Sequence, residues 1–342
     1  MPVLAQRVCD YDMLSVVKKY DVLVVGAGIA GLMCARSLSD RGRSVLVVER
    51  EPKVGGRMAT CRFDNAVFDF GAQFFTVTDL RFSAVVRELE RRGVVRVWST
   101  GYVNDEGALT PNGQVRYCGV PDMSTVCSAL AEPLDVETGS EAVRLEPREK
   151  VWRVHLDASS SVEAQAMVLT QPPPESLELL ESSGVPISRN DRTRLSAIAY
   201  EPTITLLAIC DEPHPLPGPG AVQLRHGPVQ WIADNRKKGV SPDRHALTIH
   251  AGHEFSRTHI DDRDDGIVAK VRDALQPWLD LSGAAVEVKR WRYARAVPAG
   301  EGVAVRLETP SMCICAGDGF AGPRVESAAL SGIGAAEMLA DR

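Results

Sequence analysis

Residues 21–50 read DVLVVGAGIAGLMCARSLSDRGRSVLVVER and constrain the fold more than any other part of the chain. A β-branched run at 21–25 leads into a Gly-x-Gly-x-x-Gly turn, a helix-periodic stretch continues to about residue 41, and a second β-run ends at Glu49. Strand, glycine turn, helix and strand in this order form the first half of a Rossmann dinucleotide-binding unit. The sequence therefore predicts an α/β fold.

The three glycines of the turn have different expected roles. Gly26 permits the tight turn, Gly28 lets a pyrophosphate approach the backbone, and Gly31 lets the helix pack closely on the strand. Ala30 lies in the first helical turn, where free backbone N–H groups can bind phosphate. We expect all four residues to contact a dinucleotide cofactor.

An acidic residue and a second glycine pair favour FAD as that cofactor. Glu49 is placed to accept hydrogen bonds from adenosine ribose hydroxyls, and its charge would repel the 2′-phosphate of NADP. Arg50 is expected to contribute beside it. In Gly55-Gly56-Arg57-Met58, the glycines and a planar guanidinium can wrap the pyrophosphate a second time, which makes Gly56, Arg57 and Met58 candidate cofactor contacts. A surface turn is the alternative reading.

The C-terminal stretch MCICAGDGFAGPRVESAALSGIGAAEML predicts a strand, then Gly317-Asp318, then a helix that begins near Val325. Asp318 is suited to accept hydrogen bonds from a ribityl chain. The helix N-terminus at Val325 and Glu326 can aim its positive dipole at the pyrimidine edge of a flavin. Gly332, further along this helix, can simply serve close packing.

The stretch GAQFF at residues 71–75 is a candidate floor for the cofactor site. Gly71 and Ala72 are small enough for a flat ring to approach the backbone, Gln73 is expected to face the reactive side, and Phe74 and Phe75 divide between pocket wall and core. The alternative is a purely structural turn.

The region from about 200 to 295 contains short β-rich runs and predicts a mostly antiparallel sheet, with a helix at 262–280. Trp291, Tyr293 and Arg295 alternate along one strand and share a face. Their rings can stack on an aromatic ligand and the guanidinium can bind phosphate. Core packing is the alternative for the two rings.

Several separated segments give the chain a resemblance to the flavin-containing amine oxidase superfamily, and within it to the renalases, particularly bacterial ones. The resemblance runs from about residue 20 to the end, through GAGIAGL, GGRM, FDFGAQFFT, RYCGVPDMS, WIADNRKK, HAGHEFS, RWRYARAVPAG and CAGDGFAGPRVESAALSG. It implies a flavoprotein of glutathione-reductase type with noncovalent FAD. It also implies oxidation of 1,2- or 1,6-dihydro isomers of NAD(P)H, with dioxygen reduced to hydrogen peroxide.

This resemblance adds candidate residues to the site. His250 alone reads as a structural histidine, but it belongs to the HAGHEFS segment and joins Gln73, Trp291, Tyr293 and Arg295 as a catalytic candidate. Trp231 and Asn235 join Phe74 as candidate substrate contacts. The run NRKK at 235–238 is either a solvated turn or the basic patch that an anionic substrate needs.

The last motif departs from the family pattern. The family usually has tryptophan after the Gly-Asp pair and Gly-Ala-Trp after the Val-Glu pair, where this chain has Gly319 and then Ser327, Ala328 and Ala329. Two bulky rings are therefore missing. We expect either a wider pocket or ring contacts supplied from elsewhere, and a diverged amine oxidase or dehydrogenase and a non-catalytic FAD-binding protein remain alternatives.

Composition bears on partners and location. The net charge of −6 gives no support to nucleic-acid binding, and no stretch reads as a membrane span. The eight cysteines are scattered without metal-ligand spacing, which favours reduced thiols in a cytoplasmic protein; Cys313 and Cys315 read as core residues on one strand face. We expect an N-terminal extension at 1–19, an FAD-binding domain formed by 20–75, 122–172 and 303–342, and a substrate-binding domain formed by 76–121 and 173–302.

Overall fold

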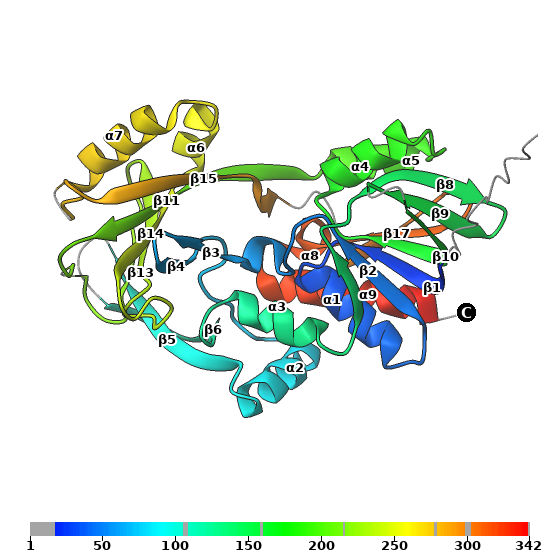
Figure 1. The fold of residues 1–342 in the computed structure, drawn as a ribbon, viewed down its shortest axis with the longest axis horizontal. Helices are drawn as coiled ribbons and strands as arrows, with labels where there is room; N and C mark the ends of the chain where they lie inside the picture. Colours follow the sequence, from blue (N-terminus) through cyan, green and yellow to red (C-terminus); the bar gives the residue numbers. More distant parts are fainter. Residues whose placement is uncertain are drawn as a thin grey trace, which may run out of the picture.

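The chain folds into two lobes built on two separate sheets (Figure 1). This structure is a computed structural model. It describes residues 18–104, 109–157, 160–214, 216–276, 279–297 and 302–340. Residues 1–17 of the expected N-terminal extension lie outside the described residues, and residues 18 and 19 begin the first strand. The predicted α/β fold with a Rossmann-type unit is confirmed.

The first sheet has the parallel centre that the glycine motif predicts. Its spatial order is β16 (Ala304–Leu307), β17 (Met312–Ala316), β10 (Ser161–Leu169), β1 (Lys18–Val25), β2 (Val45–Glu49) and β7 (Asp135–Thr138). The strands from β17 to β7 are parallel, and β16 is antiparallel to β17. An antiparallel extension, β8 (Ala142–Arg148) and β9 (Val151–Leu156), joins β10.

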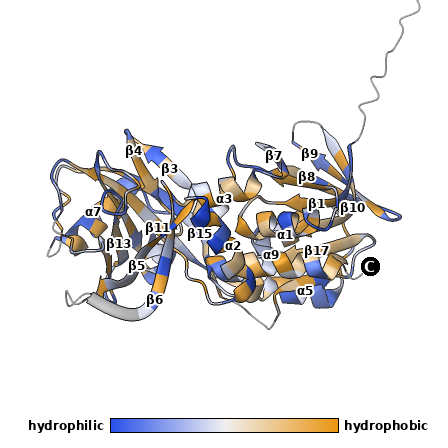
Figure 2. Cartoon of the chain, turned by 90° about the horizontal axis from the view of Figure 1, so that it is seen from below, coloured by the Kyte–Doolittle hydropathy of each residue, from blue (hydrophilic) through white to orange (hydrophobic). Residues whose placement is uncertain are grey.

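Side chains alternate between the two faces of this sheet, and both faces are covered. Val22 and Val24 share a core with α1 (Ile29–Ser39) and α9 (Val325–Ala340). Leu23 and Val25 point to the opposite face, into the core that β8 and β9 help to form. Figure 2 shows hydrophobic residues gathered along α1, α9 and the strands beside them. The prediction that Cys313 and Cys315 are buried is also confirmed.

The second sheet is mostly antiparallel, as predicted. Its order is β15 (Ala285–Val297), β11 (Ala199–Cys210), β14 (His245–Ala251), β13 (Val229–Asp234), β12 (Ala221–Gln223), β5 (Val95–Asn104) and β6 (Leu109–Gly119). One pair, β12 with β5, is parallel. Helices α6 (His253–His259) and α7 (Asp264–Leu275) pack on this sheet. None of the helices among the described residues is long and apolar enough to cross a membrane.

Short elements connect the lobes. They are the 3₁₀ turn η1 (Gly56–Met58), the hairpin β3 (Thr60–Phe63) and β4 (Ala66–Asp69), and the helices α2 (Leu80–Arg91), α3 (Ser124–Ala131) and α8 (Asp318–Ala321). The hairpin follows the Rossmann unit in sequence, yet Ala66 and Phe68 pack against Leu207 and Ile209 of the second sheet. The segment that follows β4 therefore starts at the junction of the lobes.

The helices after residue 172 belong to the first lobe. Leu180 of α4 (Pro173–Ser182) and Leu195 of α5 (Arg189–Ser196) share a core with Leu23. The sequence-based bounds of 173–302 for the substrate-binding domain include these two helices, whereas the structure packs them in the first lobe. We now propose that this boundary lies near residue 199, where β11 begins.

Helices α1 and α9 approach each other closely at one glycine. A Cβ atom on Gly332 would lie 2.0 Å from the carbonyl oxygen of Ala30, which is backbone and cannot rotate away. The close-packing reading of Gly332 is therefore confirmed, and any side chain there must push the two helices apart.

Gly332→Ala is expected to lower the free energy of unfolding by about 1–3 kcal/mol, the usual cost of overpacking. The matched control is Gly266→Ala in α7, where the nearest atom to an added Cβ is the flexible end of Lys270 at 4.0 Å. This control is expected to be neutral or stabilising by about 0.5–1 kcal/mol. Chemical denaturation measures both, and equal effects of the two substitutions would contradict the close-contact account.

Candidate functional site

In the glycine turn between β1 and α1, two of the three glycine positions have no room for a side chain and the third has room for one. The φ of Gly26 is +104°, and a Cβ on Gly31 would lie 2.0 Å from the carbonyl oxygen of Gly26. Apart from its two chain neighbours, no described residue comes within 4 Å of a Cβ built on Gly28. The protein's own packing therefore requires Gly26 and Gly31, whereas the space at Gly28 fits the approach of a ligand backbone such as a pyrophosphate.

Glu49 is held beside this turn by backbone hydrogen bonds. Its Oε2 accepts from the N–H of Ala27 at 2.7 Å, and its Oε1 accepts from the N–H of Glu51 at 3.0 Å. A carboxylate offers about four lone-pair sites, so each oxygen keeps capacity for a ribose hydroxyl. Arg50 points to the surface, where it pairs with Glu175 at 3.3 Å.

Two residues expected to bind the cofactor contact each other. The Arg57 guanidinium donates to both carboxylate oxygens of Asp318, at 2.7 and 2.6 Å, and to the carbonyl oxygen of Tyr293 at 3.2 Å. The hydroxyl of Tyr200 donates to Asp318 at 3.2 Å. Burial, together with the negative charge of Asp318, raises the pKa of Tyr200, so the phenol stays protonated. Arg57 lies in η1, and Asp318 begins α8 shortly after β17 ends.

Two side chains assigned to the cofactor are committed elsewhere. Met58 is buried in the core, with its sulfur 3.9 Å from that of Cys127. The Glu326 carboxylate accepts from the N–H and hydroxyl of Thr78, at 2.6 and 2.7 Å, and from the N–H of Asp79 at 2.8 Å. The Met58 side chain therefore faces the core, and a contact of Met58 or of the α9 N-terminus at Val325 and Glu326 with a cofactor stays a prediction.

The backbone at Gly71 and Ala72 contacts the carbonyl oxygen of Arg57. A Cβ on Gly71 would lie 2.1 Å from the carbonyl oxygen of Arg57, and the same oxygen accepts the N–H of Ala72 at 2.8 Å. The chain's own backbone therefore requires a glycine at position 71, and the approach of a flat ring to Gly71 and Ala72 stays a prediction. This contact fixes the 70–75 segment against η1.

Three of the predicted catalytic residues meet around Phe70 and Gly71. The Phe70 and Trp291 rings stack with centroids 4.8 Å apart, and the indole N–H of Trp291 donates to the Phe70 carbonyl oxygen at 3.2 Å. Nε2 of His250 lies 3.3 Å from that oxygen, and Nε2 of Gln73 donates to the Gly71 carbonyl at 3.1 Å. Burial lowers the pKa of His250 to about 4, so the ring is neutral near pH 7. We call Phe70, His250 and Trp291 the aromatic wall.

The other two predicted catalytic residues do not join the aromatic wall. The Tyr293 ring packs edge-on against Tyr200, 5.5 Å between centroids, on the side of the Arg57–Asp318 pair. Arg295 is exposed and pairs with Glu201 at 3.3 Å. Strand alternation alone suggested one cluster, but Trp291 and Arg295 lie on either side of a register shift between β11 and β15.

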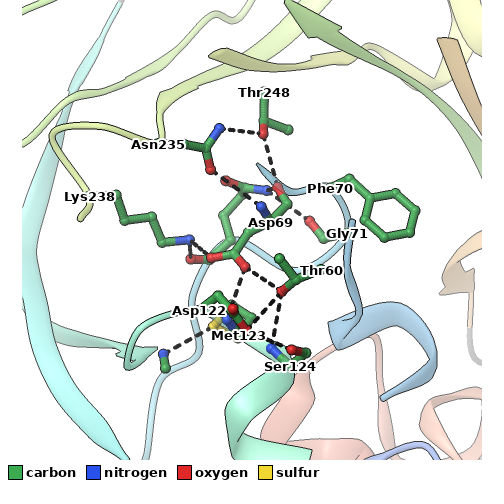
Figure 3. Close-up of polar contacts among 12 residues, drawn as sticks. Thr60, Asp69, Phe70, Gly71, Asp122, Met123, Ser124, Asn235, Lys238 and Thr248 are labelled. Carbon is green, nitrogen blue, oxygen red and sulfur yellow. Dashed lines mark hydrogen bonds and ion pairs between the residues drawn. The ribbon is translucent and has the colours of Figure 1, made fainter. Parts of the chain in front are cut away.

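The predicted substrate contact Asn235 is completely buried, and its side chain is hydrogen-bonded within the protein. Its Oδ1 accepts from the N–H of Asp69 at 3.3 Å and its Nδ2 donates to Thr248 at 2.9 Å, as Figure 3 shows. Lys238, three residues on, is also buried, with Nζ 2.7 Å from Oδ2 of Asp69. The NRKK run is therefore neither a fully solvated turn nor a free basic patch.

Phe74 and Trp231 lie together in an aromatic cluster that also contains Trp98 and Tyr102. The Trp231 centroid is 5.7 Å from Phe74, 6.4 Å from Trp98 and 5.6 Å from Tyr102. The Arg116 guanidinium lies over the Phe74 ring at 5.3 Å and the Tyr102 ring at 4.7 Å. Sequence reasoning missed all three of these residues. Trp98 and Tyr102 lie in β5, which carries no recognisable motif, and Arg116 opens the RYCGVPDMS segment but was not identified as a site residue.

The position after Asp318, where the family usually has tryptophan, is closely packed in this chain. A Cβ on Gly319 would meet Ile198 at 3.0 Å and the Tyr200 hydroxyl at 3.1 Å, which leaves no room for an indole. Ala329 is buried in the core between α9 and the first sheet. A ring contact supplied from elsewhere stays a prediction, and Tyr200, whose hydroxyl lies beside Gly319, is the candidate for it.

The depressed pKa of His250 predicts a pH dependence of stability. The pKa of His250 is 6.5 in the unfolded chain and about 4 in the folded chain. Between these two pH values the unfolded chain binds a proton that the folded chain does not. Stability contributed by the neutral ring is therefore complete above pH 6.5 and is lost as pH falls, by up to about 1.4 kcal/mol per unit. In chemical denaturation between pH 7 and pH 5, His250→Asn is expected to flatten the slope. Replacing the exposed His226 with Asn is expected to leave it unchanged; equal slopes in all three proteins would contradict this account.

Comparison with known proteins agrees with the nucleotide-binding unit. The family model for NAD(P)-binding Rossmann-like domains matches residues 24–89. Putrescine oxidase from Kocuria rosea is 45% identical over 69 residues, which are 20% of this chain and 14% of that enzyme. Renalase from Mus musculus is 21% identical over 323 residues, which cover 87% of this chain and 92% of the renalase. The similarity to putrescine oxidase thus spans about a seventh of that enzyme.

Solved structures share the fold at low identity. A putrescine oxidase structure gives a TM-score of 0.69 at 17% identity and covers 95% of this chain and 100% of its own. Cyclohexylamine oxidase from Brevibacterium oxydans gives 0.69 at 14% identity, over 94% and 99%. Among the described residues, no cluster of His, Cys, Asp and Glu suits a metal ion. The chain is thus similar to amine oxidases and to renalase, locally in the nucleotide-binding unit and at low identity over most of its length.

Proposed function

We propose that this protein is an oxidoreductase that holds FAD noncovalently. The open space at Gly28, the carboxylate of Glu49 and the Arg57–Asp318 pair support this assignment. Gly28 and the start of α1 would hold the pyrophosphate, Glu49 the adenosine ribose, and Asp318 the ribityl chain. Bound FAD supplies a hydride acceptor that returns its electrons to dioxygen as hydrogen peroxide.

We further propose that the substrate is a 1,2- or 1,6-dihydro isomer of NADH or NADPH, which is oxidised to the ordinary coenzyme. The observation that carries this proposal is the aromatic wall, in which a stacked Phe70–Trp291 pair lies beside a neutral His250. A dihydropyridine loses hydride without losing a proton from carbon, so the wall needs only to orient the ring. Similarity to mouse renalase over most of both chains supports the same substrate.

Oxidation of an amine is the second candidate, because putrescine and cyclohexylamine oxidases share the fold. An ammonium substrate binds well over aromatic faces. Here Arg116 lies over Phe74 and Tyr102, and Lys238 lies over Trp98 at 5.2 Å. The protein's own cations thus already occupy faces of the aromatic cluster, which favours the dihydronicotinamide.

A cytoplasmic location remains part of this proposal, and the seven described cysteines are all free thiols.

Anaerobic mixing distinguishes these functions. We expect 1,2- or 1,6-dihydro-NAD or -NADP to bleach the oxidised-flavin absorbance rapidly, and 1,4-dihydro-NAD, putrescine and cyclohexylamine to leave it unchanged. Admission of oxygen should then yield one peroxide per oxidised coenzyme. Bleaching by an amine alone would establish amine oxidation instead. Bound FAD that none of these reductants bleaches would contradict both enzyme functions and favour a non-catalytic flavin-binding protein.

Gly28→Ala is expected to weaken FAD binding at least tenfold while leaving the fold intact. An added Cβ at residue 28 meets no atom of the described residues within 4 Å beyond its chain neighbours, and the φ of −73° suits any L-residue. The Cβ would instead occupy the space assigned to pyrophosphate. Flavin fluorescence titration measures the affinity and thermal unfolding of the cofactor-free protein measures the fold. Gly31→Ala is the contrasting variant, which should destabilise the cofactor-free protein; unchanged FAD affinity in Gly28→Ala would refute this placement.

A further inference from the structure

A buried ion pair lies directly behind Gln73. The Lys238 ammonium and the Asp69 carboxylate have no exposed side-chain surface and lie 2.7 Å apart. The same ammonium donates to the backbone carbonyl of Gln73. Figure 3 shows Lys238 reaching Asp69 from the second-sheet side of the segment. An ion pair this deeply buried recovers its desolvation cost only when further hydrogen bonds hold it in place.

Asp69 links the ion pair to the Gln73 side chain through hydrogen bonds. Its Oδ1 accepts from the N–H of Met123 at 2.9 Å and from the Thr60 hydroxyl at 2.8 Å, at the N-terminus of α3. Its backbone carbonyl accepts from Nε2 of Gln73 at 2.5 Å and from Thr248 at 3.0 Å. Movement of Asp69 would therefore displace the amide of Gln73.

The amide of Gln73 has one atom without a partner. Its Nε2 donates to the carbonyls of Asp69 and Gly71, and this pair of acceptors fixes which end of the amide is the nitrogen. Its Oε1 is buried and accepts no hydrogen bond from the described residues. Burying an unsatisfied acceptor costs about 1–3 kcal/mol, so such an atom calls for an explanation. Gln73 also lies beside Gly71, which contacts the aromatic wall.

We propose that the Lys238–Asp69 pair positions Gln73 so that its amide oxygen accepts a hydrogen bond from an N–H group of a bound ligand. Lys238 and Asp69 are positioning residues, and Gln73 is the group that touches the ligand. The N–H belongs either to the flavin ring system or to the carboxamide of the nicotinamide substrate. This inference rests on the proposed function for the identity of both ligands.

The decisive variant removes both charges of the pair. Lys238→Met alone leaves a buried carboxylate without its counter-charge and is expected to fold poorly. Asp69→Asn combined with Lys238→Met leaves no buried charge and keeps the shape of residue 69, so it is expected to fold. It nevertheless removes the ammonium that holds the Gln73 carbonyl. Gln73→Met removes the acceptor itself, and Lys270→Met, which breaks an exposed pair with Asp262, is the control.

Two measurements identify the source of the N–H group. If it is the flavin, the double variant and Gln73→Met lose about tenfold in FAD affinity and shift the absorbance spectrum of bound flavin. If it is the carboxamide, FAD affinity is retained. In that case the preference for NAD⁺ over its analogue with a carboxylate in place of the carboxamide falls about tenfold, measured by perturbation of the flavin spectrum. Lys270→Met should match the wild type throughout.

A folded double variant that keeps FAD affinity, spectrum and dinucleotide preference within twofold of the wild type would overturn the positioning role. Gln73→Met values within twofold of the wild type would overturn the role of the amide oxygen. If the double variant does not fold, the Gln73→Met measurements alone decide whether the inference holds. If the proposed substrate is wrong, the result looks different, because the wild type then binds FAD but neither dinucleotide. In that case only the FAD affinities of the variants test the inference, and affinities equal to that of the wild type would overturn it.

Discussion

The buried contact between Lys238 and Asp69 joins the parts of the molecule on which the candidate site depends. Asp69 ends β4, Lys238 follows β13 in the second sheet, and Met123 begins α3. Their hydrogen bonds hold the 70–75 segment between the lobes, and the aromatic wall is arranged around the first residues of that segment. Both ions are shielded from water, so neither can lose its partner cheaply.

Backbone approaches shape the cofactor half of the site. The Gly31 position is closed by the Gly26 carbonyl, and the Gly71 position by the Arg57 carbonyl, while the Gly28 position is left open. A ligand therefore meets a surface whose contours come from main-chain contacts. The polar side chains Glu49 and Asp318 stand at the ends of β2 and β17. Such an arrangement places rigid elements, rather than mobile side chains, against a cofactor.

The sequence predicted what short-range spacing determines and missed what distant partners determine. The strand, turn and helix around Gly28 follow from residues close in sequence, and they were predicted correctly. Asn235 and Lys238 sit in a charged turn that reads as solvated, and only the distant Asp69 explains their burial. Arg295 was grouped with Trp291 by strand alternation, but the bulge opposite them and the pairing with Glu201 separate the two.

The closure of the first lobe by α9 has a consequence for how the protein is made. Helix α1 is translated almost three hundred residues before α9, which covers it, and β10 must wait for β17 to become its parallel neighbour. During synthesis the second sheet is therefore complete while the first sheet still exposes an apolar edge and an uncovered helix. A growing chain in that state is exposed to aggregation, which makes chaperone binding during translation most valuable for the nucleotide-binding lobe.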